Sequence, residues 1–178
     1  MKMLTTERLI LRNFTTDDYP DFVALIQDKM ASEWHVYDSQ WPVDKGQLMY
    51  SLAYVIKHDY WFAIELKEEK RVIGYVVAGV TDDGTKCDIG YTLHGEYQRC
   101  GYAFEACSAI MHMRAADSRL EQFTAGTADC NYPSRGLLGK LGFRRISSEL
   151  VSFAKDENGR PITFLGSTYE CSADKWRV

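Results

Sequence analysis

The feature that most constrains the fold is a change of hydrophobic period in the second half of the chain. Residues 86–94 alternate between apolar and polar side chains, a pattern that is typical of a half-buried strand. After Gly101 the apolar side chains recur at helical spacing, which predicts a helix that ends near Asp117. Alternation returns at residues 123–127. This strand–helix–strand passage predicts a sheet with at least one helix packed on a face.

Turn-forming residues divide the rest of the chain into predicted hairpins and helices. Turn-forming residues at 67–70, at 82–84 and at 156–161, where Asn-Gly occurs, predict tight connections between neighbouring strands. Further strands are expected at residues 7–14, 60–66 and 72–80 and on both sides of the 156–161 turn, and further helices after Thr15–Asp18, at about 44–58 and at about 133–141. We therefore predict an α+β fold with a mixed sheet, in a single domain spanning residues 1–178.

Composition and charge argue against several classes of function. The formal charge is 21 − 25 = −4, and no cationic cluster is present that could neutralise a nucleic-acid backbone. No stretch approaches the roughly 20 apolar residues of a membrane span, and Lys2, Glu7 and Arg8 interrupt any signal-peptide core. The five cysteines contain no Cys-x-x-Cys pair, which argues against a disulfide scaffold or a metal site. We expect a cytoplasmic protein that binds no nucleic acid, no membrane and no metal.

A candidate anion site lies where the predicted strand 86–94 gives way to the helix that begins at Gly101. Backbone N–H groups at a helix start have no helical acceptor, and the helix dipole adds about half a positive charge there. Gly101 and Ala103 carry little or no side chain, so a bulky diphosphate can approach the backbone closely. A glycine at a strand–helix junction can equally serve packing, and these residues alone leave both interpretations open.

Four segments resemble one enzyme family, in the same order along the chain. They are Thr6–Arg12, the strand Asp88-Ile89-Gly90-Tyr91, the run Gln98-x-x-Gly101-x-Ala103, and Asn131-x-x-Ser134 followed by Lys140-Leu141-Gly142-Phe143. The third resembles the pyrophosphate motif of the GNAT acetyltransferases, and the others resemble the RimJ/RimL-like branch, which acetylates ribosomal-protein N-termini. The resemblance implies a mostly antiparallel central sheet of about seven strands flanked by about four helices, with acetyl-CoA as the acetyl donor.

The resemblance also implies which residues bind CoA. Backbone amides of the segment 98–104 would hold the pyrophosphate, namely Gln98, Arg99, Cys100, Gly101, Tyr102, Ala103 and Phe104. Leu93, at the end of its strand, would pair with the pantetheine arm and polarise the thioester carbonyl through its N–H. Asn131 would hydrogen-bond the pantetheine arm. Just before Pro133, Asn131 is also suited to a turn or a helix cap, and one residue can do both.

The expected reaction is direct attack of a neutral amine on the thioester, which needs a base for the amine and a proton for the leaving sulfur. Ser134 resembles the proton donor of the branch, while Leu138 occupies the position where many GNAT enzymes have a tyrosine. Asp88 and Glu96 are the candidate bases, and Asp88 is one methylene shorter than the usual glutamate. Each residue also has an interpretation without a catalytic role. Ser134 can be an ordinary residue of the first turn of a helix, and Asp88 and Glu96 can be ordinary surface carboxylates.

The acceptor is less well defined by the sequence. Trp34 and Tyr37 lie in a loop beside the first two predicted helices, where the family binds its substrate, although aromatic residues in such a loop also serve as core. We therefore predict an N-acetyltransferase that acts on a small-molecule amine or a protein N-terminus, with a homodimer left open. The alternative is a catalytically inactive CoA-binding regulatory module, which Leu138 and the short side chain of Asp88 keep under consideration.

Overall fold

The computed structural model describes residues 3–177, and within that range the chain forms an eight-stranded sheet and four α-helices. The strands are β1 (Leu4–Thr5), β2 (Leu9–Arg12), β3 (Trp61–Leu66), β4 (Arg71–Val80), β5 (Lys86–Leu93), β6 (Gln122–Ala128), β7 (Arg144–Lys155) and β8 (Pro161–Ser172). The helices are α1 (Tyr19–Ala31), α2 (Lys45–Lys57), α3 (Tyr102–Ala115) and α4 (Tyr132–Lys140). Strand order is β1-β2-β3-β4-β5-β6-β8-β7, and only β5 and β6 run parallel. The predicted mixed, mostly antiparallel α+β sheet is therefore confirmed.

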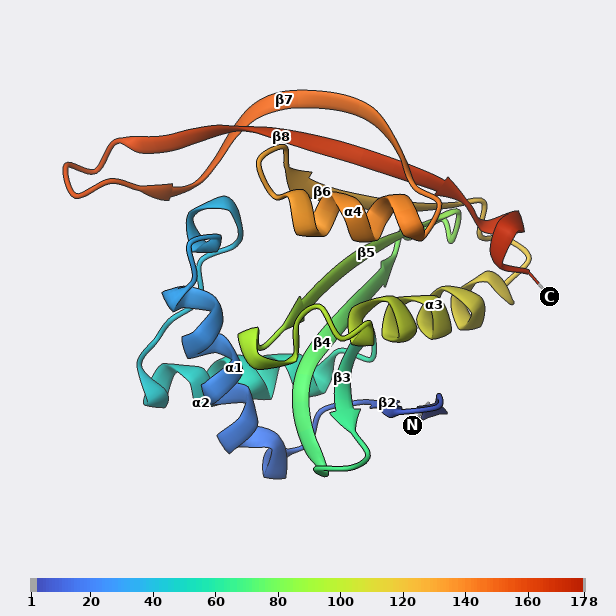
Figure 1. The fold of residues 1–178 in the computed structure, drawn as a ribbon, viewed down its shortest axis with the longest axis horizontal. Helices are drawn as coiled ribbons and strands as arrows, with labels where there is room; N and C mark the ends of the chain where they lie inside the picture. The colour runs from blue at the N-terminus through green and yellow to red at the C-terminus, as the bar shows by residue number, and fades with distance from the viewer. Residues whose placement is uncertain (1–2, 178) are drawn as a thin grey trace.

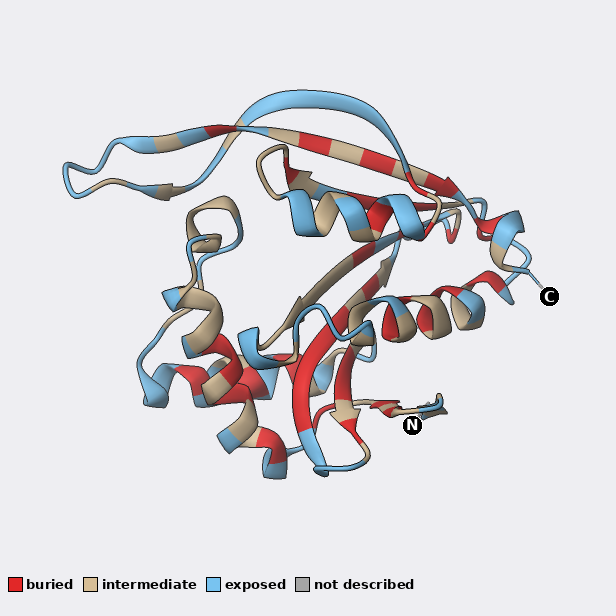
Figure 2. Cartoon of the chain, in the orientation of Figure 1, coloured by how far each residue is buried: buried red, intermediate tan, exposed pale blue. Residues whose placement is uncertain are grey.

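Helices cover the sheet from both faces (Figure 1). On one face α3 and α4 contribute Ile110 and Leu138 to a buried cluster that also contains Ile89 of β5. On the other face α1 and α2 contribute Phe22 and Leu52 to a second cluster. Figure 2 shows that burial is concentrated in the central strands and on the inner sides of the helices. The helical spacing after Gly101 correctly predicted a buried side for α3, where Ala106, Cys107 and Ile110 are buried.

Strands β5 and β6 separate after a short parallel ladder. They pair only over Lys86–Asp88 and Gln122–Thr124, although β5 continues to Leu93 and β6 to Ala128. The antiparallel partner β4 follows β5 to its end, and β8 follows β6, so only the facing edges of β5 and β6 lose their partners. The result is a gap in the middle of the sheet, where Figure 1 shows the two strands running apart.

A long hairpin forms the C-terminal edge of the sheet. β7 pairs with β8 over Pro161–Glu170, with two register shifts, whereas β6 pairs with β8 only over Gly166–Ser172, so the hairpin tip extends beyond the sheet. In Figure 1 this tip projects over the segment between α1 and α2. The two are in contact, because Tyr37 meets Phe164 edge to face with ring centroids 5.1 Å apart.

The N-terminus differs from the predicted elements. The predicted strand 7–14 forms only over Leu9–Arg12, and the extra strand β1 raises the number from about seven to eight. The cause is a turn in which the Thr6 N–H donates to Leu9 O at 3.0 Å and folds β1 back onto β2. Arg12, at the end of β2, bonds Asp18 at 2.7 Å and Glu65 at 2.6 Å, which ties the strand to the start of α1.

Candidate active site

The end of β5 turns backbone groups toward the gap. The His94 N–H donates to Ile73 O at 2.9 Å, so the opposed residues Leu93 and Gly74 form a non-hydrogen-bonded pair. The N–H and C=O of Leu93 therefore point away from β4 and toward the side from which β6 has already separated. Gln98 Nε2 donates to Leu93 O at 3.1 Å, while the Leu93 N–H has no acceptor among residues 3–177. This N–H is free to bind a carbonyl oxygen in the gap.

Gly74 allows β4 and β5 to lie this close. A Cβ atom at position 74 would lie 2.3 Å from Thr92 O and 2.6 Å from Leu93 Cδ2, so any side chain would displace the end of β5. Sequence analysis did not identify Gly74 as part of the site. Its only signal is a glycine inside a predicted strand, which is typical of a close backbone approach.

The segment between β5 and α3 carries a row of unpaired amides. Arg99 and Gly101 have positive φ angles of 63° and 86°, and Gly101 is the N-terminal cap residue of α3. The Gln98 N–H donates to Gly95 O at 3.2 Å, and the next backbone N–H that finds a carbonyl is that of Glu105, which donates to Gly101 O at 3.1 Å. In the described part of the chain the amides of residues 99–104 thus have no acceptor, and such an arrangement is suited to a phosphate.

Arg8 contacts this segment from the N-terminal strands. Its NH1 donates to Cys100 O at 2.9 Å, and its guanidinium carbon lies 4.4 Å from the ring centroid of Tyr102. Glu105, in the first turn of α3, accepts from Arg8 Nε at 2.7 Å, from the Arg8 N–H at 2.9 Å and from the Thr6 hydroxyl at 2.5 Å. The Thr6–Arg12 motif predicts no role for Arg8, because the motif does not reveal a contact with residues more than 90 positions away.

Glu105 should make part of the stability dependent on pH. Partial burial raises the pKa of Glu105, but hydrogen bonds from Thr6 and Arg8 outweigh burial, and the net effect is a lowered pKa. Such a carboxylate stabilises the fold above its unfolded pKa of about 4.3, and this stabilisation is lost as the pH falls through the lower folded value. We expect the melting-temperature difference between wild type and Glu105→Gln, measured by calorimetry, to be largest near pH 7 and to shrink below about pH 4. A difference that stays constant across this range would contradict the assignment.

Ser134 lies in the first turn of α4, beside the gap. Asn131 caps this helix by accepting the Ser134 N–H on Oδ1 at 3.1 Å, while its Nδ2 has no partner in the part of the chain that the structure describes. Ser134 Oγ lies 2.9 Å from Tyr91 Oη, and the Tyr91 hydroxyl also donates to Ser134 O at 3.2 Å. Burial raises the pKa of Tyr91, so the phenol keeps its proton at neutral pH. The sequence motif that contains Tyr91 did not predict its contact with Ser134.

The two candidate bases occupy different surroundings. Asp88 is the last residue of β5 that pairs with β6, so it stands where the gap begins, and its Oδ1 accepts from the Thr124 hydroxyl at 2.8 Å. Strand alternation places Asp88 on the face opposite Tyr91. Glu96 lies in a short 3-10 turn after β5, where its side chain is 77% exposed and 3.9 Å from the His94 ring. Only Asp88 of these two residues adjoins the gap.

Trp34 and Tyr37 are neighbours, with ring centroids 6.2 Å apart, and they contact different elements. Trp34 lines a cavity of about 250 Å³ together with Asp28, Ala31, Ser32, Glu33, Gly95 and Gln98, next to the end of β5. Tyr37 packs against Phe164 of β8, and interaction with the side chain of Cys130, just before α4, raises the pKa of Tyr37. The loop between α1 and α2 therefore contacts β8 and lies next to the end of β5, where two carboxylates, Asp28 of α1 and Glu33 of the loop, line the same cavity.

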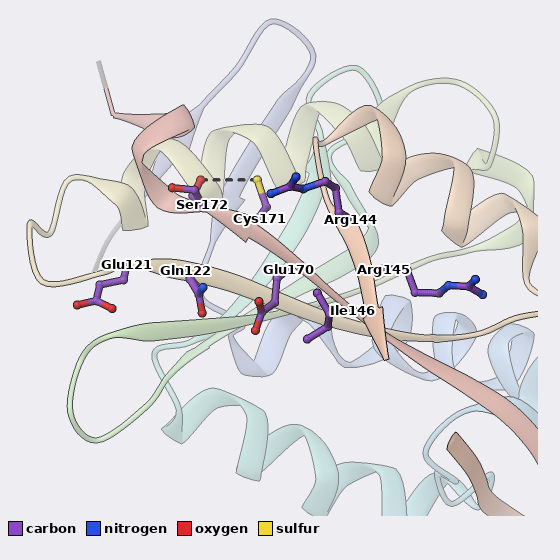
Figure 3. A pocket seen from close by; sticks show the side chains of 8 residues that line it. All are labelled: Glu121, Gln122, Arg144, Arg145, Ile146, Glu170, Cys171 and Ser172. Carbon is purple, nitrogen blue, oxygen red and sulfur yellow. Dashed lines mark hydrogen bonds between the residues drawn. The ribbon is translucent and has the colours of Figure 1, made fainter. Parts of the chain in front are cut away.

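A larger cavity of about 390 Å³ lies elsewhere (Figure 3). It is lined by Glu121, Gln122, Arg144, Arg145, Ile146, Glu170, Cys171 and Ser172. Gln122 pairs with Lys86 at the beginning of β5, and the seven residues from there to Leu93 span about 23 Å at roughly 3.3 Å per residue. This cavity is therefore remote from the end of β5 and from the start of α3.

Two other kinds of feature are absent from residues 3–177. No group of three or more His, Cys, Asp or Glu side chains is placed to hold a metal ion. In the same range, no helix has the length and apolar character needed to cross a membrane.

Comparison with known families gives one match over most of the chain. Residues 8–144 match the family described as the Acetyltransferase (GNAT) domain. That range contains the end of β5, the amides of residues 99–104, and Ser134.

Individual relatives share only a low sequence identity with this chain. The chain is 24% identical over 147 residues to the uncharacterized N-acetyltransferase YoaA of Bacillus subtilis, covering 80% of this chain and 83% of that protein. It is 26% identical over 164 residues to the [ribosomal protein uS5]-alanine N-acetyltransferase of Escherichia coli, covering 86% and 81%. Among solved structures, RimL, a ribosomal L7/L12 α-N-protein acetyltransferase in complex with CoA, superposes with a TM-score of 0.79 at 15% identity, covering 96% and 98%.

Proposed function

We propose that this chain, which belongs to the GNAT acetyltransferase family, acetylates the N-terminal α-amine of a protein. As a GNAT N-acetyltransferase, the enzyme transfers an acetyl group from acetyl-CoA to an amine. The proposal adds the residues that do this and the class of acceptor. The observation that carries it is the gap between β5 and β6, which has the Leu93 N–H at one side, Ser134 at the other and Asp88 where it begins.

The residues at the start of α3 fit CoA. Unpaired amides between Arg99 and Phe104, together with the dipole of α3, suit the two charged phosphates. Beyond them the β5–β6 gap has the length of several residues and an exposed backbone, which suits the amide-bearing pantetheine arm. Asn131 supplies a free amide donor, Nδ2, at the opposite side of the gap. In this proposal acetyl-CoA supplies the activated acetyl group, and the chain supplies positioning and proton transfer.

Leu93 and Ser134 have separate roles in the proposal. The Leu93 N–H points into the gap and stabilises negative charge on the thioester oxygen as the amine attacks. The Ser134 hydroxyl donates a hydrogen bond, and then its proton, to the sulfur. Tyr91 Oη, 2.9 Å from Ser134 Oγ, holds the serine in place and passes it a proton as the serine gives up its own, because the phenol is protonated at neutral pH. The tyrosine then regains a proton from solvent, which also takes up the amine proton from Asp88.

Asp88 is the proposed base, and it acts through a chain of waters, since Leu93 lies five residues further along β5, about 17 Å away at roughly 3.3 Å per residue. We expect Asp88→Asn to lower kcat/KM about tenfold near neutral pH, because the acceptor must lose a proton before it attacks. The loss should diminish above about pH 8, where an α-amine is largely neutral without help. The measurement is the pH–rate profile of both enzymes on one peptide, with Glu96→Gln as the comparison. A tenfold loss in Glu96→Gln and none in Asp88→Asn would move the role to Glu96.

The acceptor class is supported by charge and by relatives. Asp28 and Glu33 line the 250 Å³ cavity near the end of β5 and attract an ammonium group. The α-amine of a protein has a pKa of about 8, against about 10.4 for lysine, so it offers far more of the neutral form at physiological pH. Two of the similar proteins are described as acetyltransferases of ribosomal proteins. Location in the cytoplasm is part of the same proposal, and the five free cysteines agree with a reducing compartment.

The experiment is thiol release from acetyl-CoA across a panel of amines. Peptides that differ in their first residue are compared with the same peptides blocked at the N-terminus and carrying one lysine, and with spermidine and an aminoglycoside. Fastest turnover on unblocked peptides supports the proposal, whereas preference for spermidine or the aminoglycoside contradicts the acceptor class. CoA binding without turnover on any amine would favour the inactive binding module. Absence of CoA binding would refute the assignment of the site.

A further inference from the structure

Among the described residues, the guanidinium of Arg8 makes the only long-range side-chain hydrogen bond to the backbone of residues 99–101. It reaches the segment from the turn between β1 and β2, and all of its contacts are short: Cys100 O at 2.9 Å through NH1, and Glu105 Oε2 at 2.7 Å through Nε and NH2. Its carbon lies 4.4 Å from the Tyr102 ring centroid. One side chain thus connects the last loop residues to the first turn of α3.

The bond to Cys100 O fixes the direction of a peptide unit. In a planar trans peptide the C=O and the following N–H point in opposite directions. When Arg8 holds the Cys100 carbonyl, the Gly101 N–H is therefore directed away from Arg8. The same side of Gly101 is closed by Arg8, because a Cβ atom at position 101 would lie 3.3 Å from Arg8 NH2. A phosphate must approach from the opposite side, where the amides point.

The bond to Glu105 removes an unfavourable charge. Glu105 lies in the first turn of α3, close to the amides proposed to bind two phosphates, and its lowered pKa keeps it ionised at neutral pH. An uncompensated carboxylate at this position would repel the diphosphate. Arg8 meets this carboxylate with two nitrogens and its own N–H, so the pair adds no net charge to the site.

We propose that Arg8 is a positioning residue for the diphosphate of CoA, acting through the Cys100–Gly101 peptide and through Glu105. The inference rests on the proposed CoA site at residues 99–104. Arg8 does not bind the ligand in this scheme: three of its five N–H donors serve Cys100 O and Glu105, and the phosphate approaches from the side opposite Arg8. Its planar group serves two acceptors at fixed angles, and a lysine ammonium cannot reproduce that geometry.

The test is calorimetric titration of CoA into wild type, Arg8→Met and Arg8→Lys. Arg8→Met keeps an unbranched stem over Tyr102, and we expect its Kd for CoA to rise roughly tenfold, the effect typical of losing a charged hydrogen bond. Arg8→Lys should lose nearly as much. A Kd within twofold of wild type in Arg8→Met overturns the proposal, and so does full rescue by lysine, which would mean that positive charge alone matters.

Two controls separate positioning from general destabilisation. Arg12 lies in the same motif and also pairs with two carboxylates, Asp18 and Glu65, but on the side of α1. Arg12→Met should lower the melting temperature and leave the CoA Kd within twofold.

In a second readout, kcat/KM is measured with S-acetylpantetheine, which lacks the diphosphate, and Arg8→Met should match wild type. An equal loss with this donor would show that Arg8 acts on the fold. Failure of wild type to bind CoA would instead refute the CoA site itself.

Discussion

Ser134→Ala is expected to lower the turnover number about a hundredfold while the Kd for CoA stays within twofold of wild type. The hydroxyl is the polar group of α4 that faces Tyr91 across the end of the gap, and alanine leaves the departing sulfur without a proton donor. The backbone role of position 134 survives, because the N–H that Asn131 caps is retained. Steady-state kinetics with saturating peptide give turnover, and calorimetry gives the affinity.

Tyr91→Phe is the matched variant for this experiment. It removes the partner of Ser134 and keeps the ring in the cluster beneath α3, so turnover should fall less than in Ser134→Ala, by about tenfold. An unchanged turnover number in Ser134→Ala would show that the serine is structural. A larger loss in Tyr91→Phe than in Ser134→Ala would transfer the proton-donor role to the tyrosine.

Gly101→Val is expected to weaken CoA binding about a hundredfold, the second of the two largest effects. Position 101 has φ of 86°, a conformation that a β-branched residue adopts only with strain, and its Cβ would lie 3.3 Å from Arg8 NH2. If the backbone at position 101 shifts to relieve the strained φ or the contact with Arg8, the amides of residues 99–104 no longer point toward one phosphate. The measurement is the calorimetric Kd for CoA, accompanied by a melting curve to show that the variant folds.

Gly139→Val provides a control with the same chemical change. Gly139 lies on the exposed side of α4, where an added Cβ meets no atom within 4 Å, so CoA affinity should be unaffected. A Gly101→Val protein that binds CoA as tightly as wild type would refute the phosphate site at the start of α3. Equal losses in both variants would indicate a general response to added bulk.

Local patterns predicted the elements of this fold well. The alternation in β5, the helical spacing in α3 and the Asn-Gly turn before β8 each depend on neighbouring residues, and all three occur where expected. The extra strand β1 escaped prediction because a two-residue strand has no period. The resemblance of Gln98–Ala103 to a family motif predicts the CoA segment, and the family itself is confirmed by the match over residues 8–144.

The residues that tertiary structure added to the site are Gly74, Arg8 and Tyr91. Each acts on a partner distant in sequence: Gly74 lies against Thr92 and Leu93, Arg8 reaches Cys100, and Tyr91 reaches Ser134. Sequence spacing carries no information on such contacts, because they arise only after the strands have paired. The roles of the predicted catalytic and CoA-binding residues stay predictions that the experiments above test.

The sequence by itself determined the helices, most of the strands and the family, and it supplied the proposed position of the phosphate-binding segment, because each depends on residues that are close along the chain. Only the tertiary structure decided where β5 and β6 separate, which way the Leu93 N–H points and which side chain holds the Cys100 carbonyl. Register explains the difference: a shift of one residue between β4 and β5 would reverse the direction of every amide at the gap, and pairing across the sheet sets that register.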